Sequence, residues 1–134
     1  MPQLSQLDAT FIRYETVMDT FDVVEGDADT WRQRGCPTVK MTSPREHMII
    51  VKTLAEAQGV MFQCPKCYKT NGHYCSVTFA NRGVPDDQGT HNSKGEPVRW
   101  TVTGTGLHDL TTKPSVQLQG GCNWHGWITN GSAD

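Results

Sequence analysis

The chain has 134 residues, 36% of them hydrophobic, and its 12 basic and 14 acidic residues give a formal net charge of -2. This length fits one domain with a modest core, and the near-neutral charge excludes a global field that would draw the protein onto nucleic acid or an anionic membrane. The longest strongly apolar run, at 48–51, is far shorter than the roughly 20 residues of a membrane-spanning helix. The N-terminus lacks a basic and then apolar signal pattern, so we expect a soluble protein made in a cytoplasm.

The first part of the chain predicts a strand followed by an inserted segment. Residues 9–18 are rich in aromatic and β-branched types, which predicts a strand that ends near Asp19. The acidic stretch 19–45 is interpreted as an insertion or lid. Within it, residues 27–34 fit a short helix that an aspartate caps and a glycine ends.

The middle of the chain predicts a hairpin. Residues 47–52 are a second strand candidate, and Thr53 with Glu56 three positions later fits a capping box, which predicts one or two helical turns. Residues 60–63 and 74–79 then predict two strands on either side of a tight turn. A strand that delivers side chains into such a turn is typical of metal sites.

The last third of the chain predicts a long loop and three short strands. Residues 80–97 contain several glycines and prolines and few apolar residues, which predicts an exposed loop. Strands are predicted at 98–103, 115–119 and 127–129, and the Asn-Gly pair at 130–131 is a turn signal.

These short strands and glycine-rich turns predict a mainly β fold, a small antiparallel β domain with one or two short helices. The sequence contains no linker composition and no long internal repeat. We therefore expect a single domain over residues 1–134, stapled by a zinc site that two knuckles form.

The zinc prediction depends on two matched pairs of ligands, Cys64 with Cys67 and Cys122 with His125, each with two residues between its members. Three thiolates and one imidazole are a common set for structural zinc, and two tight turns from distant parts of the chain can close a tetrahedral ion. The sequence therefore predicts Zn²⁺ as the cofactor. A site closed by four protein ligands leaves no position for a reactive water, so the ion is expected to be structural.

Alternatives to this ligand set remain open. The first pair also fits a redox dithiol, although such a motif is typical of a βαβ context and here strands flank it. His73 lies six residues after Cys67 and could replace one ligand or donate a hydrogen bond to one. The two remaining cysteines are interpreted as a free thiol, Cys36, and a small buried residue, Cys75.

The motifs of the second half resemble two groups of uncharacterised proteins over residues 53–131. The Cys64-Pro65-Lys66-Cys67 string, together with Gly120-Gly121-Cys122 and Trp124-His125-Gly126, looks like a family of small tailed-phage proteins. The Leu-Thr-x-x-Pro-Ser-Val and Cys-x-x-His patterns are similar to bacterial domains, some of which occur beside ubiquitin-like conjugation genes. Some phage members carry an ammonia monooxygenase label, but that chemistry resembles a copper-dependent membrane complex, and this chain has no histidine-rich copper set.

The phage resemblance implies a metal at the four matching positions and no settled activity. Because the motifs supply ligands but no visible nucleophile or base, no catalytic residue is assigned. The leading hypothesis is a phage-encoded, zinc-stabilised binding or structural protein. It would be a minor virion component, with a possible oligomer in the virion, or an accessory protein that engages a host factor. Its expected location is the host cytoplasm or the virion, and its expected partners are other phage or host proteins.

Two other classes of function are weighed against this one. The first is a zinc-dependent hydrolase or isopeptidase-like enzyme with an open metal position, in which His73, His108 or Asp109 is the general base. The second and weaker one is a zinc-ribbon-like nucleic-acid binder, against which the net charge argues. It would need five cations to converge on one face, namely Lys66, Lys69, Arg82, Lys94 and Arg99.

Overall fold

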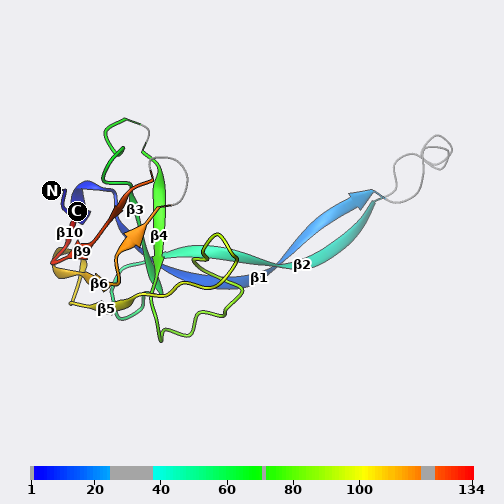
Figure 1. Ribbon diagram of the computed structural model, residues 1–134. Helices are drawn as coiled ribbons and strands as arrows, with labels where there is room; N and C mark the ends of the chain where they lie inside the picture. Colours follow the sequence, from blue (N-terminus) through cyan, green and yellow to red (C-terminus); the bar gives the residue numbers. More distant parts are fainter. Residues whose placement is uncertain (1, 25–37, 71, 119–122) are drawn as a thin grey trace. The chain divides into compact units, whose positions relative to one another are not determined.

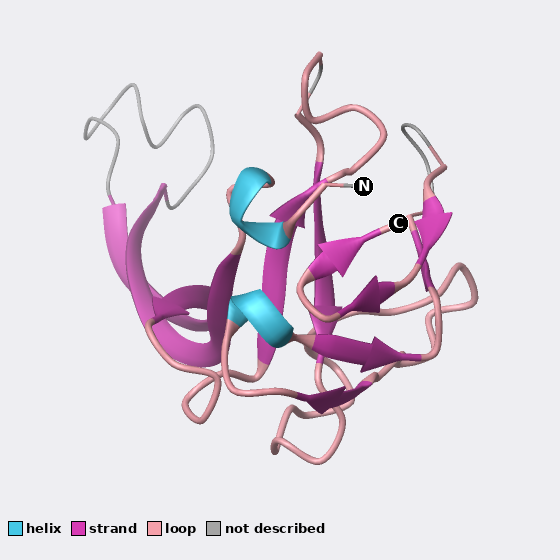
Figure 2. Ribbon diagram, turned by 90° about the vertical axis from the view of Figure 1, so that its left-hand side faces the viewer, coloured by secondary structure: helices cyan, strands magenta, loops and turns pink. Residues whose placement is uncertain are grey.

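The computed structural model describes residues 2–24, 38–70, 72–118 and 123–134. Within these ranges the chain is mainly β, which confirms the predicted fold class (Figure 2). The regular elements, in chain order, are η1 (Leu4–Gln6), β1 (Thr10–Val24), β2 (Thr38–Val51), β3 (Gly59–Gln63), β4 (Tyr74–Thr78), β5 (Thr101–Thr103), η2 (Leu107–Asp109), β6 (Thr111–Lys113), β7 (Val116–Gln117), β8 (His125–Gly126), β9 (Ile128–Thr129) and β10 (Ser132–Ala133). The helix predicted at 27–34 lies outside the described residues.

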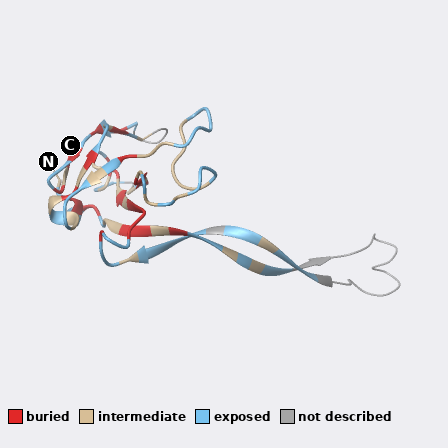
Figure 3. Cartoon of the chain, turned by 90° about the horizontal axis from the view of Figure 1, so that it is seen from below, coloured by how far each residue is buried: buried red, intermediate tan, exposed pale blue. Residues whose placement is uncertain are grey.

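The chain divides into two compact units, one formed by Met1–Tyr14 with Met48–Asp134 and the other by Glu15–His47. The second unit contains the segment predicted as an insertion or lid. Its described part consists of residues 15–24 of β1 and residues 38–47 of β2, and β1 continues past the predicted end near Asp19 to Val24. Several large apolar side chains of these two strands are exposed, as Figure 3 indicates by its pale blue segments. The candidate site described below lies wholly in the first unit.

β1 to β4 form a four-stranded sheet in the order β2-β1-β3-β4 (Figure 1). The first unit contains β3, β4, the start of β1 and the end of β2. β3 pairs antiparallel with both of its neighbours, with Phe11 opposite Val60 and Val77 opposite Val60 on the other side. The β3–β4 hairpin was predicted within one residue at each end. Three two-stranded sheets, β5–β6, β7–β8 and β9–β10, complete the unit.

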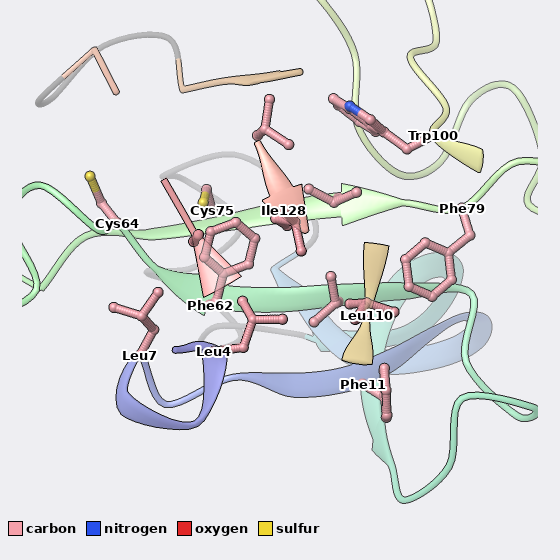
Figure 4. Close-up of a cluster of buried hydrophobic side chains, with 14 of the residues drawn as sticks. Leu4, Leu7, Phe11, Phe62, Cys64, Cys75, Phe79, Trp100, Leu110 and Ile128 are labelled. Carbon is pink, nitrogen blue, oxygen red and sulfur yellow. The ribbon is translucent and has the colours of Figure 1, made fainter. Parts of the chain in front are cut away.

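The core lies against one face of the β3–β4 hairpin, and alternate residues of both strands point into it. Val60 and Phe62 of β3 are fully buried, as is Val77 of β4, which follows from the period of two in a strand. The ring of Trp124 meets Phe62 edge-on, with centroids 6.1 Å apart and an interplanar angle of 89°. Figure 4 shows Phe62, Phe79 and Leu110 among the side chains of this cluster, with Leu4 and Leu7 from the N-terminal turn. The apolar cluster therefore joins both ends of the chain to the hairpin.

Truncation of the central ring tests this description of the core. We expect Phe62→Ala to lower the free energy of unfolding by roughly 3–5 kcal/mol, because it removes a fully buried ring and leaves a cavity. Met61→Ala is the matched control, since Met61 is only partly buried on the same strand. Chemical denaturation measures both changes. A loss below about 1 kcal/mol for Phe62→Ala would contradict the packing, since even partial collapse of such a site costs more.

The two ends of the chain lie side by side in the first unit (Figure 1). The amide of Leu4 donates to the carbonyl of Gly131 at 2.7 Å, and the amide of Ala133 donates to the carbonyl of Pro2 at 3.0 Å. Asn130 and Gly131 both have positive φ, 49° and 79°, as a two-residue hairpin turn requires. The predicted turn signal is confirmed, and it joins β9 to a last strand, β10, that the sequence analysis did not predict.

Other local predictions need correction. The segment after Thr53 is a turn and not a helix, although the amide of Glu56 donates to the Thr53 hydroxyl at 3.4 Å, which is one of the two bonds of a capping box. Residues 52–58 are all that separates β2 from β3, and so short a segment offsets little of the cost of starting a helix. The strand predicted at 98–103 is shorter, because Trp100 makes only an isolated bridge to Phe79 before β5 begins. No helix among the described residues is long and apolar enough to cross a bilayer.

Candidate active site

A serine and a histidine meet on the β7–β8 hairpin. In its register, Gln117 lies opposite His125. Ser115 precedes Gln117 by two residues and so projects from the same face, on the diagonal from His125, where a long side chain can reach it. The Ser115 hydroxyl Oγ and His125 Nε2 are 2.9 Å apart, a hydrogen-bond distance, and His125 is exposed. A serine hydroxyl bonded to an imidazole nitrogen is the arrangement of a nucleophile and its general base.

The segment that carries Ser115 is anchored on both sides. Before it, β6 pairs with β5, and Lys113 lies opposite Thr101. The peptide bond between Lys113 and Pro114 is cis. The indole Nε1 of the buried Trp100 donates to the carbonyl of Ser115 at 3.2 Å, so the core holds the backbone of Ser115 directly. These contacts restrain Ser115, which a nucleophile needs if its oxygen is to stay aligned with a base.

The indole hydrogen bond gives a positioning role to Trp100. We expect Trp100→Phe, which keeps an aromatic ring and removes the donor, to lower kcat roughly five- to tenfold with little change in KM, the equivalent of one hydrogen bond of about 1 kcal/mol. Steady-state kinetics measures this split, and thermal unfolding is measured alongside. A fall in thermal stability without a change in kcat would show that the hydrogen bond serves only the fold.

Ser115 opens onto a groove of about 450 Å³, here named the Ser115 groove. Residues 74–76 of β4 line it on one side and residues 115–118 on another, and the loop at 90–92 together with Val98 and Trp100 completes the lining. A larger cavity of about 590 Å³ contains His108 but neither Ser115 nor His125. We place the candidate site at the smaller groove, because Ser115 lines it and His125, which is outside the lining, is hydrogen-bonded to Ser115.

The thiol of Cys75 also lines this groove, and its chemistry differs from that of Ser115. Burial, and then the neighbouring Cys64 and Cys67, raise the pKa of Cys75 to about 12. A thiol with such a pKa stays protonated at neutral pH and is a poor nucleophile. Ser115 is therefore the better candidate for attack on a substrate.

The predicted zinc ligands fall into three groups. Cys64 and Cys67 are buried free thiols in the turn after β3, and Cys67 Sγ lies 3.5 Å from Nδ1 of His73. Cys122 lies outside the described residues. The Nε2 of His125 is engaged with Ser115. Among the described residues no group of three or more histidine, cysteine or acidic side chains is arranged to hold a metal ion, so the zinc staple and its four ligands stay a prediction.

The general bases that the sequence analysis considered for an enzyme are not at the serine. Asp109 accepts hydrogen bonds from the amides of Thr105 and Gly106 and from the Thr105 hydroxyl, all at 2.9 Å. These bonds, the amide of Thr105 first, lower the pKa of Asp109 to about 2. Its carboxylate closes a turn. His108 is 3.9 Å from this carboxylate and lines the larger cavity.

Two of the five cations considered for nucleic-acid binding are used inside the fold. Arg82 donates to the carbonyls of Leu54 and Ala57, both at 2.8 Å. Arg99 donates to four backbone carbonyls in and around the loop at 85–98. Both guanidinium groups are therefore engaged with backbone carbonyls of the fold, and the expectation that nucleic acid is an unlikely partner stays a prediction.

Comparison with known proteins identifies a family for most of the chain. The model of the family described as "bacterial ubiquitination-like system serine protease (BubE)" matches residues 35–134. This segment contains β2 to β10, and so it includes both Ser115 and His125. Neither the curated proteins nor the solved structures contain a match to the chain.

This match corrects the leading functional hypothesis. The expectation of a phage-encoded binding or structural protein, in a virion or on a host factor, is wrong, because the matching family is a serine protease of a bacterial system. The hydrolase alternative fits better. No catalytic residue was assigned from the sequence, and the hydrogen-bonded pair of Ser115 and His125 is the candidate that the structure adds. The Pro-Ser-Val and Cys-x-x-His patterns contain Ser115 and His125, but the serine was interpreted only as the start of a strand.

Proposed function

Because the chain belongs to the BubE family of bacterial ubiquitination-like system serine proteases, we propose that it is a serine hydrolase that cleaves amide bonds in the proteins of such a system. Ser115 is the nucleophile and His125 is its general base. The observation that carries the proposal is the 2.9 Å contact between Ser115 Oγ and His125 Nε2 at the edge of a groove. The substrate class is a ubiquitin-like protein, cut at a peptide or isopeptide bond.

The reaction follows from the roles of the two side chains. Ser115 Oγ attacks the carbonyl carbon of the scissile bond while Nε2 of His125 takes its proton. The imidazolium then gives that proton to the leaving amine, so the carbon–nitrogen bond breaks and an ester remains on Ser115. Water, deprotonated by the same imidazole, then attacks the ester carbonyl carbon. The bond from that carbon to Ser115 Oγ breaks, the imidazolium returns the proton to Oγ, and the acid product leaves as a carboxylate. The described residues supply no carboxylate that bonds the second nitrogen of His125, so the pair is proposed as a dyad.

Covalent labelling tests this assignment. A fluorophosphonate probe reacts with serines that a base activates, and we expect one adduct per chain on the peptide that contains Ser115. Mass spectrometry of the digested protein locates it. The natural reaction is tested with a ubiquitin-like protein of the same bacterial system, joined through its C-terminus to a reporter. Absence of an adduct on Ser115, with the protein folded, would refute the proposal.

A structural zinc ion remains part of the proposal, supported by the chemistry of the donors. Cys64 and Cys67 are buried, reduced and one turn apart, and the amide of Cys67 bonds to the carbonyl of Cys64 at 3.2 Å. Two thiolates so placed suit half of a tetrahedral zinc site. Cys122 would supply the third ligand, and His73 or His125 the fourth. The ion would act as a cross-link between distant turns of a small domain.

Removal of a thiolate tests the ion. We expect Cys64→Ser to reduce bound zinc from about one equivalent to less than half and to lower the thermal midpoint, because metal binding and folding are coupled in small zinc domains. Cys75→Ala is the matched control, since Cys75 is buried nearby but is not a proposed ligand. Elemental analysis measures zinc in each protein. Wild-type protein that is folded with under half an equivalent of zinc would contradict the proposal.

A further inference from the structure

The outer edge of β4 faces the Ser115 groove with unpaired backbone groups. The carbonyl of Thr78 accepts a hydrogen bond from the amide of Trp100, on the side of β4 away from β3. Because backbone groups alternate sides along a strand, those of Tyr74 and Ser76 also point away from β3. The Ser76 carbonyl accepts from the Thr90 hydroxyl at 3.1 Å. The amide of Ser76 and both backbone groups of Tyr74 have no partner among the described residues.

A second unpaired edge lies on the opposite wall. The amide of Leu118 donates to the carbonyl of Trp124 at 2.7 Å, which fixes Leu118 as a residue bonded across the β7–β8 hairpin. Its neighbour Gln117 therefore directs its amide and carbonyl away from β8, and neither has a partner in the part of the chain that the structure describes. Ser115 is two residues before Gln117 on this same wall. The groove thus has a strand edge on each side and the nucleophile at one end.

The side chains that line the groove carry no carboxylate, ammonium or guanidinium group. Its apolar members include Cys75, Trp100 and Val116, which are all buried, with Val98 and Leu118 partly buried beside them. The imidazole of His91 also lines the groove, but its Nδ1 and Nε2 already lie 3.0 and 2.6 Å from the backbone carbonyls of Gly89 and Asp86. A charged substrate side chain would therefore lose its hydration here without gaining an ion-pair partner, which is costly. An uncharged side chain would bury apolar surface instead.

We propose that the substrate binds in the Ser115 groove as an extended segment, its backbone hydrogen-bonded to the free edges of β4 and β7 and its side chains beside the cleaved bond uncharged. This inference rests on the proposed function and adds the conformation and chemistry of the substrate to it. Strand addition to an exposed edge is a common way to bind extended peptides, because backbone hydrogen bonds supply affinity and pockets for alternate side chains supply specificity. A folded loop or helix could not satisfy both edges, since its backbone groups bond within itself.

Peptide cleavage tests the chemistry of the groove without any change to the fold. A proteome-derived peptide library is digested with the full chain, and the cleaved bonds are identified by mass spectrometry. We expect lysine, arginine, aspartate and glutamate to be depleted at least tenfold at the positions that flank the cleaved bond. The best neutral peptide is then remade with one backbone N-methyl group at a time. N-methylation at positions that pair with an edge is expected to lower kcat/KM roughly tenfold, as the loss of one hydrogen bond predicts.

A pair of matched variants tests the location. Asn92→Asp introduces one negative charge into the groove lining. The new carboxylate keeps the oxygen that accepts from the amides of Lys94 and Glu96, and it loses only the 3.4 Å bond from Nδ2 to the Glu96 carboxylate. We expect it to raise cleavage of peptides with lysine or arginine near the bond by at least tenfold relative to neutral peptides. Asn130→Asp makes the same chemical change in the β9–β10 turn, outside the lining, and is expected to leave the preference unchanged.

The outcomes separate this inference from the proposed function. Equal cleavage of charged and neutral sequences, indifference to N-methylation, or an unchanged preference in Asn92→Asp would each overturn the groove assignment. A chain that the fluorophosphonate labels at Ser115 but that cleaves no peptide would overturn it too, while Ser115 would remain an activated nucleophile. Absence of both labelling and cleavage would remove the proposed function itself, and the inference with it.

Discussion

Replacement of Ser115 by alanine is expected to reduce kcat for amide cleavage by roughly 10⁴- to 10⁶-fold, because it removes the oxygen atom that is proposed to form the covalent intermediate. The change removes a single oxygen atom, from a residue that is only partly buried and whose hydroxyl bonds to the exposed His125. The free energy of unfolding should therefore change by less than about 1 kcal/mol. Activity should be lost while KM, measured on any residual turnover, stays close to that of the wild type.

The matched control is Ser93→Ala, on the exposed loop outside the groove. It should retain full activity and full labelling by the fluorophosphonate probe, whereas Ser115→Ala should lose both. Circular dichroism and the thermal midpoint establish that the two variants are equally folded. If Ser115→Ala kept more than a tenth of wild-type kcat with its fold intact, another nucleophile would be responsible and the dyad would be refuted.

Local sequence patterns predicted the β3–β4 hairpin, because each of its strands has a pattern that is recognisable in the sequence. Residues 60–63 alternate between buried and partly exposed positions, and the strand at 74–78 does the same, so the period of two is visible in the sequence. The strands β8 and β10 have only two residues each. No period is detectable at that length, and the pairing of these strands is set by the core and by the junction between the chain ends.

The dyad could not be derived from spacing alone. Ser115 and His125 are ten residues apart, and only the register that sets Gln117 opposite His125 brings them onto one face of one hairpin. A shift of one residue in this register would send the serine to the other face. His125 was interpreted as half of a zinc knuckle, and the role of a base now proposed for it was not among the alternatives. Cysteine and histidine spacing indicates metal binding strongly, whereas a serine near a strand has no such signature.

The role of His125 is the second large effect, because the two interpretations of this residue predict different measurements. As the base of the dyad, His125 is required for activity, and we expect His125→Ala to lower kcat by roughly 10³- to 10⁶-fold while zinc content and thermal stability stay at the wild-type level. As a zinc ligand, His125 would be required for both the metal and the fold. Its position favours the first role, since Nε2 bonds to Ser115 Oγ at 2.9 Å and the side chain is exposed.

Two further variants complete this test. His47→Ala, an exposed histidine in the other unit of the chain, is the control and should change neither kcat nor zinc. His73→Ala should release zinc if His73 is the fourth ligand, because its Nδ1 already lies 3.5 Å from the thiol of Cys67. Loss of zinc on His125→Ala, with retention on His73→Ala, would place His125 in the metal site. A histidine that coordinates zinc through Nε2 could not also take the proton of Ser115, so that result would remove the base from the proposed dyad.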